Sequence, residues 1–392
     1  MRILYSLPHP ADKLGSGAGH VIRASAMLAA LESLGHTILR VQAATEGSGG
    51  GGKAAVGIYR NVVKKLMPRP LAMRMRDMGR IKFGQGYGRR LIEIIERERP
   101  DVILETHIAF SLAGASASEA TGVPLVLDDV APAWEEEQQY GVGLKQAARS
   151  IHHDVTGCAK LLVAVNKTLC QYLIDEGQPA NKVVVVENGI DDSTFRLGLD
   201  GSPMRQKYAI PADAVVIVFV GSFQPYHRVD LLLRAFAKVT APHVRLLLVG
   251  QGQTSAEARA LAEQLGVLDR TIFTGSVPYP EVPAHLAAGD IAIMPATNEY
   301  GNPMKLYEYM ALGKVVVAPD QPTITEIATH SQDSFLFPKE DVEGMAAALN
   351  TLAADSALRQ RLGDAGSRLA GQHTWRKRAE TLTEAMRRVG IG

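Results

Sequence analysis

Residues 219–236, FVGSFQPYHRVDLLLRAF, contain an apolar run, then a loop with glycine, proline and polar residues, and then a helix with an apolar stripe. This strand–loop–helix order recurs through the second half of the chain. Short β-branched runs occur at residues 214–220, 244–249, 271–274, 291–294, 315–318 and 335–337. Strands that alternate with helices form parallel sheets with helices on both faces. The second half is therefore predicted to be an α/β domain with a doubly wound parallel sheet.

The first half of the chain repeats this pattern, with apolar runs at residues 2–7, 37–41, 101–104, 124–127, 161–165 and 183–187. A stretch rich in Gly, Asp and Ser separates the two sets of runs. We predict an N-terminal domain over residues 1–195, a C-terminal domain over 196–373, and a helix within 374–392 that crosses back to the N-terminal domain. Ligands of such domains bind at the carboxyl ends of the strands, so the predicted site is a cleft between the domains.

The composition is that of a soluble globular protein: 392 residues, 46% apolar and 21% charged. Forty-two basic and 41 acidic residues give a net charge of +1, so the molecule has no overall field that would attract nucleic acid. Cys158 and Cys170 are the only cysteines and form no metal-binding motif, so we expect neither a disulfide framework nor a zinc ribbon. No apolar run is long enough to span a bilayer, and we expect a cytoplasmic protein.

One segment is strongly basic. Residues 58–90 contain ten Lys or Arg and a single acidic residue, Asp77. Interleaved apolar residues predict an amphipathic basic helix in part of the segment. Two interpretations stay open: a solvated face with methionines on its inner side, or contact with a phosphate-bearing acceptor or anionic lipids, which would make the protein peripheral on the inner face of the plasma membrane. Nucleic acid is disfavoured, because the aromatic residues form no stacking platform.

The loop GSGAGH, residues 15–20, follows the first strand and opens a helix. Backbone N–H groups at a helix N-terminus bind anions, and glycine such as Gly17 lets a ligand approach them closely. The spacing differs from the dinucleotide motif G-x-G-x-x-G, and no acidic residue ends the second strand to hold a ribose. Gly17 is a candidate binding residue for a phosphate-bearing ligand, with a plain tight turn as the alternative.

The C-terminal domain carries the densest set of candidate residues for binding a nucleotide diphosphate. Side chains that could donate hydrogen bonds to a pyrophosphate occur in the loop of residues 219–236. His227 could equally be a helix cap or a surface histidine. Glycine turns after the next two runs could leave backbone groups for a nucleoside. In MPATNEYGNPMKLYEYM, residues 294–310, a helix starts after Pro303, and Glu308 either binds ribose hydroxyls or only complements the helix dipole. The candidates are Gly221, Ser222, His227, Arg228, Gly250, Val277, Glu299, Tyr300, Gly301, Met304, Lys305, Leu306 and Glu308.

These motifs, taken in order along nearly the whole chain, resemble those of the retaining glycosyltransferases of family 4. The resemblance rests on Gly35-His36, ENGID at residues 187–191, LLLVGQG at 246–252, FTGSVPYPEVP at 273–283 and the two stretches quoted above. It implies the GT-B architecture, in which two Rossmann-like domains face a central cleft. It also implies a UDP- or GDP-sugar donor on the C-terminal domain and a glycan or lipid-linked acceptor on the N-terminal domain. The anomeric configuration would be retained, with no cofactor and no obligatory metal. The expected role is in envelope or exported polysaccharide assembly.

The chain departs from the family pattern at three positions. Ser222 and His227 stand where family members often have Arg and Lys, so Arg228 and Lys305 are the candidates to bind the diphosphate. The family's two glutamates are eight residues apart, whereas Glu299 lies nine residues before Glu308 and Tyr300 takes the eighth position. Glu299 could still reach the donor sugar after a backbone shift.

The family often has a histidine near the sugar, after the strand that corresponds to residues 124–127. Here Asp128 and Asp129 follow that strand, and His107 ends the preceding one. The three are candidate catalytic residues, and a structural role such as capping the next helix is an equal alternative for each. Two other functions stay open: a catalytically silent nucleotide-binding scaffold, and a nucleotide-sugar epimerase.

Overall fold

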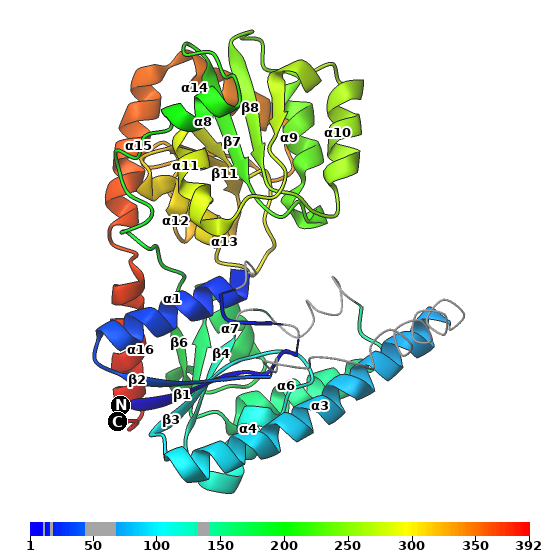
Figure 1. Cartoon of the computed structure of the whole chain (residues 1–392), viewed down its shortest axis with the longest axis vertical. Helices are drawn as coiled ribbons and strands as arrows, with labels where there is room; N and C mark the ends of the chain where they lie inside the picture. Colours follow the sequence, from blue (N-terminus) through cyan, green and yellow to red (C-terminus); the bar gives the residue numbers. More distant parts are fainter. Residues whose placement is uncertain (11, 16–18, 44–67, 130, 132–140) are drawn as a thin grey trace. The chain divides into compact units, whose positions relative to one another are not determined.

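The computed structural model describes residues 1–10, 12–15, 19–43, 68–129, 131 and 141–392 (Figure 1). Gly17 and residues 58–67 of the basic segment lie outside these ranges, and the side chain of Asp129 is not described. The chain forms two compact units. The first comprises Met1–Glu187 and Ala379–Gly392, and the second comprises Asn188–Arg378.

The first unit contains a six-stranded sheet in the order β2-β1-β3-β4-β5-β6, with every neighbouring pair parallel. Its strands are β1 (Arg2–Leu7), β2 (Thr37–Gln42), β3 (Val102–Thr106), β4 (Leu125–Asp129), β5 (Leu161–Ala164) and β6 (Val183–Val185). Strands β3 and β5 are buried along their whole length, as expected when helices cover both faces of a parallel sheet.

The helices of this unit are α1 (Gly19–Ser33), α3 (Arg69–Glu98), α4 (Ala113–Thr121), α6 (Lys145–Cys158), α7 (Lys167–Asp175), the short η1 (Ala180–Lys182) and most of α16 (Trp375–Arg388). Helix α3 has proline in its first turn and ends where Arg99 adopts the left-handed conformation. It packs against α4 through Gly84 and Gly88, where an added Cβ would lie 3.4 and 3.3 Å from the backbone of α4 and its preceding loop. The glycines therefore let the two helices approach closely.

The second unit contains another six-stranded parallel sheet, in the order β12-β11-β10-β7-β8-β9. Its strands are β7 (Val215–Val220), β8 (Val244–Val249), β9 (Thr271–Phe273), β10 (Ile291–Ile293), β11 (Val315–Asp320) and β12 (Phe335–Pro338). Alternate residues of β7 belong to two different hydrophobic clusters, one on each face of the sheet. The prediction of two doubly wound parallel sheets is confirmed.

The helices of the second unit cover both sheet faces. They are α8 (Ser202–Lys207), η2 (Pro225–His227), α9 (Val229–Phe236), α10 (Ser255–Gln264), η3 (Leu268–Arg270), η4 (Tyr279–Glu281), α11 (Val282–Ala287), α12 (Met304–Ala311), α13 (Pro322–Thr325), α14 (Val342–Ala354) and α15 (Ser356–Ala370). Helices α9, α10 and α14 pack on one face, and α11 and α12 pack on the other.

The strand order places a topological switch point in each unit. In the first unit the chain runs outward from β1 to β2 and then returns to β3 on the other side of β1; in the second unit β7 and β10 have the same relation. The loops after two such strands diverge to opposite sides of the sheet and leave a crevice between them. The loops after β7 and β10 are those that carry most of the candidate donor-binding residues.

The units divide between Glu187 and Asn188, a few residues before the predicted boundary at 195. Asn188 is held in the second unit because its backbone N–H donates to the side chain of Asn302 over 2.8 Å. An added Cβ at Gly189 would lie 2.8 Å from the backbone nitrogen of Trp375, so this residue also packs within the second unit. Among the described helices, none is both long enough and apolar enough to cross a bilayer.

Candidate donor site

Two glycine loops of the second unit touch each other through their backbones at the carboxyl ends of β7 and β8. Gly221 donates its N–H to the carbonyl of Val249 over 3.0 Å. Gly250 has φ +121, and an added Cβ there would lie 2.0 Å from the carbonyl oxygen of Gly221. A Cβ on Gly252 would lie 1.7 Å from the carbonyl of Ser222. Only glycine fits these positions, so the two loops form one backbone surface.

His227 lies behind this surface and contacts Lys305 of α12, with 3.1 Å between the imidazole Nε2 and the lysine Nζ. The pairing follows from the switch point, since one residue follows β7 and the other follows β10. His227 is 5% exposed, and burial together with the neighbouring lysine lowers the pKa of its imidazole to about 2. Burial lowers the pKa of Lys305 to about 8, and Glu308 opposes that shift. His227 is therefore neutral at physiological pH, and Lys305 carries the charge.

The imidazole of His227 also links Lys305 to the β7 loop. Its Nδ1 accepts a hydrogen bond from the backbone N–H of Gln224 over 3.3 Å. A neutral imidazole has one N–H and cannot accept hydrogen bonds at both nitrogens. The charged Lys305 and the backbone N–H of Gln224 are both donors, so they compete for the single acceptor nitrogen of the neutral ring.

Glu308 lies one turn after Lys305 on α12 and is 6% exposed. Its Oε1 accepts a hydrogen bond from the Tyr279 hydroxyl over 2.8 Å. Burial raises the pKa of the Glu308 carboxyl, although Tyr279 and Lys305 oppose the shift. Burial of the Tyr279 hydroxyl and the adjacent Glu308 carboxyl raise the pKa of Tyr279. Val277 precedes Tyr279 in the loop after β9 and is partly buried against the hydrophobic cluster on the α11 and α12 face of the sheet.

The start of α12 supplies backbone groups beside Lys305. Pro303 precedes the helix, and no side chain among the described residues caps its first turn. The N–H of Leu306 donates to the carbonyl of Pro303 over 3.1 Å, so the amides of Met304 and Lys305 are the ones that can face a ligand. Helix N-termini carry partial positive charge, which favours a phosphate at this position.

Two charged candidates are engaged with other side chains. The guanidinium of Arg228 forms two hydrogen bonds of 3.0 Å with Asp230 and a contact of 3.4 Å with Glu340. Glu299 is exposed and pairs with Lys339 over 2.5 Å. A diphosphate at Arg228 would have to compete with two carboxylates, which leaves Lys305 as the main candidate cation.

The remaining candidates are distributed around these groups. Ser222 is exposed, and Tyr300 is buried at 8% exposure. Gly301 donates its N–H to the side chain of Asn298 over 2.7 Å. An added Cβ on Gly301 would lie 2.2 Å from the same oxygen. The glycine therefore permits the turn that leads into α12.

In the first unit, His107 is paired with a residue that the sequence did not identify. Its Nε2 lies 3.1 Å from Nδ1 of His152 on α6, and both rings are buried. Burial lowers the pKa of His107 to about 3 and that of His152 to about 4. Within the described part of the chain, the remaining ring nitrogens, His107 Nδ1 and His152 Nε2, have no hydrogen-bond partner. The pair is neutral at physiological pH.

Asp128 forms a buried bidentate ion pair with Arg23 of α1, at 2.9 and 3.1 Å. Arg23 also donates to the carbonyls of Val186 and Glu187, over 2.9 and 3.3 Å. It therefore joins β4 to the end of the first unit. Neither Arg23 nor His152 could be found from sequence, because each lies in a helix that otherwise has an ordinary pattern. Asp129 ends β4, and its side chain lies outside the described structure.

Another titratable cluster follows β1. Asp12 Oδ2 lies 2.6 Å from Nε2 of His20 and 3.1 Å from Nδ1 of His9. These side chains are partly exposed. A small cleft beside them is lined by Pro8–Pro10, by residues 108–111 after β3, and by three residues of α3. It occupies the switch point of the first unit.

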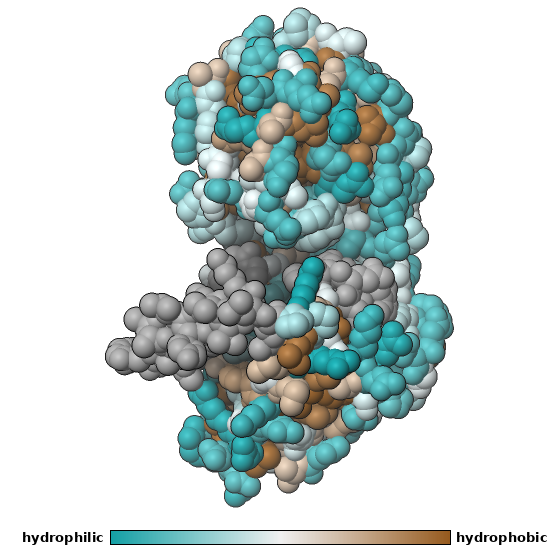
Figure 2. All heavy atoms as spheres, turned by 90° about the vertical axis from the view of Figure 1, so that its right-hand side faces the viewer, coloured by the Kyte–Doolittle hydropathy of each residue, from teal (hydrophilic) through white to brown (hydrophobic). Residues whose placement is uncertain are grey.

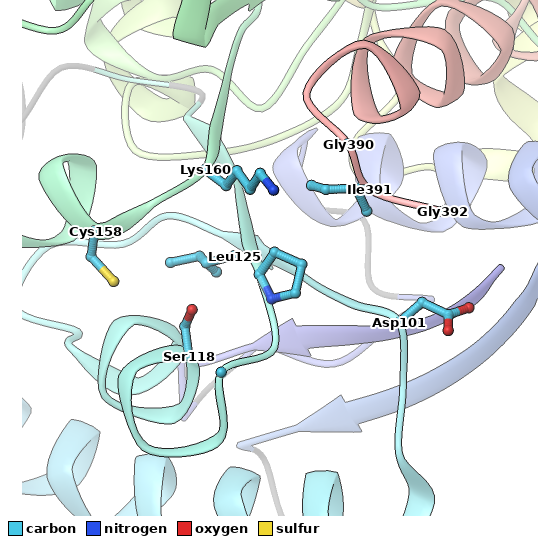
Figure 3. Close-up of a pocket in the computed structure, with 10 residues that line it drawn as sticks. Asp101, Ser118, Leu125, Cys158, Lys160, Gly390, Ile391 and Gly392 are labelled. Atoms are coloured by element: carbon cyan, nitrogen blue, oxygen red, sulfur yellow. The ribbon is translucent and has the colours of Figure 1, made fainter.

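A larger cavity of about 550 Å³ lies at the amino ends of the strands of this sheet (Figure 3). Figure 3 shows Asp101, Leu125 and Lys160 around it, at the amino ends of β3, β4 and β5, with Gly390–Gly392 beside them. Ligands of doubly wound sheets bind at the carboxyl ends. This cavity is therefore separate from the carboxyl ends of the strands, where the ligand is predicted to bind. Within the residues that the structure describes, no group of three or more His, Cys, Asp or Glu is arranged to hold a metal ion.

Known proteins are similar to this chain in sequence and in fold. Residues 202–369 match the family model of glycosyl transferases group 1, and residues 18–189 match the glycosyl transferase 4-like domain. A D-inositol 3-phosphate glycosyltransferase of Thermobispora bispora is 30% identical over 313 residues, 75% of this chain and 73% of the relative. One from Kribbella flavida is 34% identical over 221 residues, 54% of this chain and 51% of the relative, so the chain matches only about half of that protein.

Among solved structures, Anabaena HepE in complex with UDP and glucose has a TM-score of 0.72, with 99% of both chains covered and 19% identity. At this identity the likeness concerns the fold, which is GT-B in both chains. Together with the two family models, which match the two halves of the chain, these similarities show that this protein belongs to the group 1 glycosyl transferases.

Proposed function

We propose that this chain transfers a sugar from a nucleotide-diphosphate donor, a UDP- or GDP-sugar, to a hydroxyl of a glycan or lipid-linked acceptor, with retention of configuration. The acceptor would belong to envelope or exported polysaccharide assembly. The names of the relatives support the reaction class: the curated relatives are D-inositol 3-phosphate glycosyltransferases, and the HepE structures contain UDP or UDP-glucose.

The observation that carries the proposal is the arrangement on α12. Lys305 supplies a cation at the helix N-terminus, and Glu308 supplies a carboxylate one turn later, beside the loops after β7 and β9. A cation and free amides stabilise a departing diphosphate. A buried carboxylate accepts hydrogen bonds from the hydroxyls of a sugar or ribose.

In the proposed reaction, the bond between the anomeric carbon and the diphosphate oxygen breaks while the acceptor oxygen bonds to the same face of the sugar. The acceptor proton passes to the leaving phosphate oxygen, so no paired carboxylates are required. Lys305 and the α12 amides stabilise the charge that develops on the diphosphate. Because this cation belongs to the protein, we propose that transfer needs no metal, and EDTA should leave the rate unchanged.

A thermal-shift panel of UDP, GDP, ADP and dTDP is the first test. A nucleotide at 100 times its Kd adds about 2.7 kcal/mol of stability, which shifts Tm by several degrees. The nucleotide that binds selects the donor sugars for assays with glycan and lipid-linked acceptors. A variant tests the proposed cation. Lys305→Ala should lower kcat/KM roughly 100- to 1000-fold, because one group that stabilises the departing diphosphate is lost. The control Lys238→Ala, at an exposed lysine paired with Glu343, should be unchanged.

The outcomes separate the alternatives. Turnover with retained configuration, measured by NMR of the product, supports the proposal. Nucleotide binding without turnover on a broad acceptor panel contradicts it and supports a silent scaffold. Consumption of the nucleotide sugar without an acceptor would support an epimerase.

A further inference from the structure

Helix α3 presents apolar side chains to solvent. Leu71, Met75 and Met78 are 49%, 56% and 61% exposed. Their spacing places them on one face of the helix. The buried residues of α3, among them Gly84 and Leu91, lie on the opposite face, which packs on the rest of the first unit. Among the residues that the structure describes, this stripe has no role in the core of its own unit, and an exposed apolar stripe of this kind indicates an external partner.

Basic residues extend the same stripe. Lys82 and Arg89 continue the spacing of Leu71, Met75 and Met78 and are exposed, and Arg74 is exposed beside them. In the space-filling view, apolar and hydrophilic atoms lie side by side on the face of this unit that is turned to the viewer (Figure 2). An apolar stripe flanked by cations is typical of a helix that lies in a membrane interface.

The negative charge of this part of α3 is removed from the surface. Asp77 is the only acidic residue between Arg69 and Ile92, and it is fully buried. Its carboxylate accepts hydrogen bonds from Arg76 over 2.8 Å and from the backbone N–H of Gly143 over 2.7 Å. The exposed surface of α3 up to Arg90 is therefore cationic, and its charge complements an anionic surface.

We propose that the outward stripe of α3, formed by Leu71, Met75 and Met78 with Arg74, Lys82 and Arg89, docks the protein on a bilayer that contains anionic lipids. The three apolar side chains insert at the level of the headgroups, and the three cations contact lipid phosphates. The charge complementarity favours this occupant over an apolar protein surface. The inference concerns a surface outside the donor site and does not depend on the proposed function.

The test is co-sedimentation of the full chain with vesicles of phosphatidylcholine alone or with 30% phosphatidylglycerol, without nucleotide. We expect at least tenfold stronger binding to the anionic vesicles, and at least fivefold weaker binding when salt rises from 50 to 300 mM. The variant Leu71→Ser/Met75→Ser/Met78→Ser and the variant Arg74→Gln/Lys82→Gln/Arg89→Gln should each lose at least fivefold in affinity with unchanged Tm.

Matched controls come from the second unit: Leu197→Ser, at a leucine that is 60% exposed, and Arg234→Gln/Lys238→Gln, at exposed basic residues. Both should bind vesicles like the unaltered protein. Equal binding to neutral and anionic vesicles, or wild-type binding by both stripe variants, would overturn the proposal. So would a dimer in light scattering that the serine variant converts to monomer, because a second copy would then cover the stripe. Donor binding by thermal shift is measured separately, so failure here leaves the proposed transfer unaffected.

Discussion

His227 illustrates how a residue changes its chemical meaning once its neighbours are known. From sequence, the imidazole in the β7 loop is predicted to become protonated as pH falls through about 6.5 and then to bind a diphosphate more tightly. In the structure the imidazole is buried against Lys305, and its pKa is lowered to about 2. Protonation of His227 therefore cannot explain donor binding at physiological pH, and we propose instead that its contact with Lys305 positions that lysine.

The pH dependence of donor affinity should instead follow Lys305, whose pKa is lowered to about 8 by burial. The ammonium form of Lys305 attracts the diphosphate. Donor affinity should therefore change little around pH 7 and should fall as pH rises above about 8, by up to tenfold per pH unit. Calorimetric titration with UDP-glucose between pH 6.5 and 9.5 measures this. Lys305→Arg should move the decline out of the range, because arginine stays charged. Affinity that strengthens on acidification through about 6.5 would restore His227 as the cation and contradict this assignment.

At the scale of elements, the donor site depends on two loops that touch through backbone atoms. The loops after β7 and β8 can touch because Gly250 and Gly252 have no Cβ. The contact brings the carboxyl ends of two adjacent strands into one surface, next to the N-terminus of α12. Glycine here serves a close approach between segments distant in sequence, in addition to its turn conformation.

The variant Gly250→Ala tests this contact. Its methyl group would lie 2.0 Å from the carbonyl oxygen of Gly221, so the loops must separate. We expect donor affinity to fall at least tenfold and Tm to fall by several degrees, measured by titration and thermal melting. Gly266→Ala is the matched control, because Gly266 also has positive φ, at +68, but has open space around its Cβ position. The control should lose only about 1 kcal/mol and bind donor normally; equal losses in both variants would mean that backbone strain alone matters.

At the scale of the whole molecule, the chain ends in the unit where it began. Helix α16 starts in the second unit at Trp375, and from Ala379 onward it belongs to the first unit. Leu382 and Met386 are buried, at 2% and 0% exposure, and Thr383 lies 3.1 Å from Nε2 of His36. The first unit is therefore completed by residues far from it in sequence.

The variant Leu382→Ala/Met386→Ala should destabilise the first unit selectively. Removing two buried side chains of this size costs about 2–5 kcal/mol each. Differential scanning calorimetry should show a lower transition for the first unit, while the transition that nucleotide raises stays in place. Glu384→Ala/Arg387→Ala, at exposed positions of the same helix, is the control and should melt like the unaltered chain. If nucleotide binding is lost together with the stability of the first unit, the two units do not melt independently.

The sequence by itself determined the two six-stranded parallel sheets, the glycine turns and the start of α12 after Pro303. These features depend on side-chain periodicity and on the backbone preferences of Gly and Pro, which are local properties. For the same reason the basic amphipathic character of α3 could be predicted, but which of its side chains face solvent could not.

Only the tertiary structure decided which candidate charges are available. It paired Arg228 with Asp230 and Glu340, Asp128 with Arg23, and His107 with His152. All but the first of these partners are distant in sequence. Whether a side chain is charged depends on its burial and on charges a few ångströms away, and both are set by packing between elements. A sequence names the residues of such a site, and only their packing selects Lys305 as the main candidate cation at the carboxyl ends of β7 and β10.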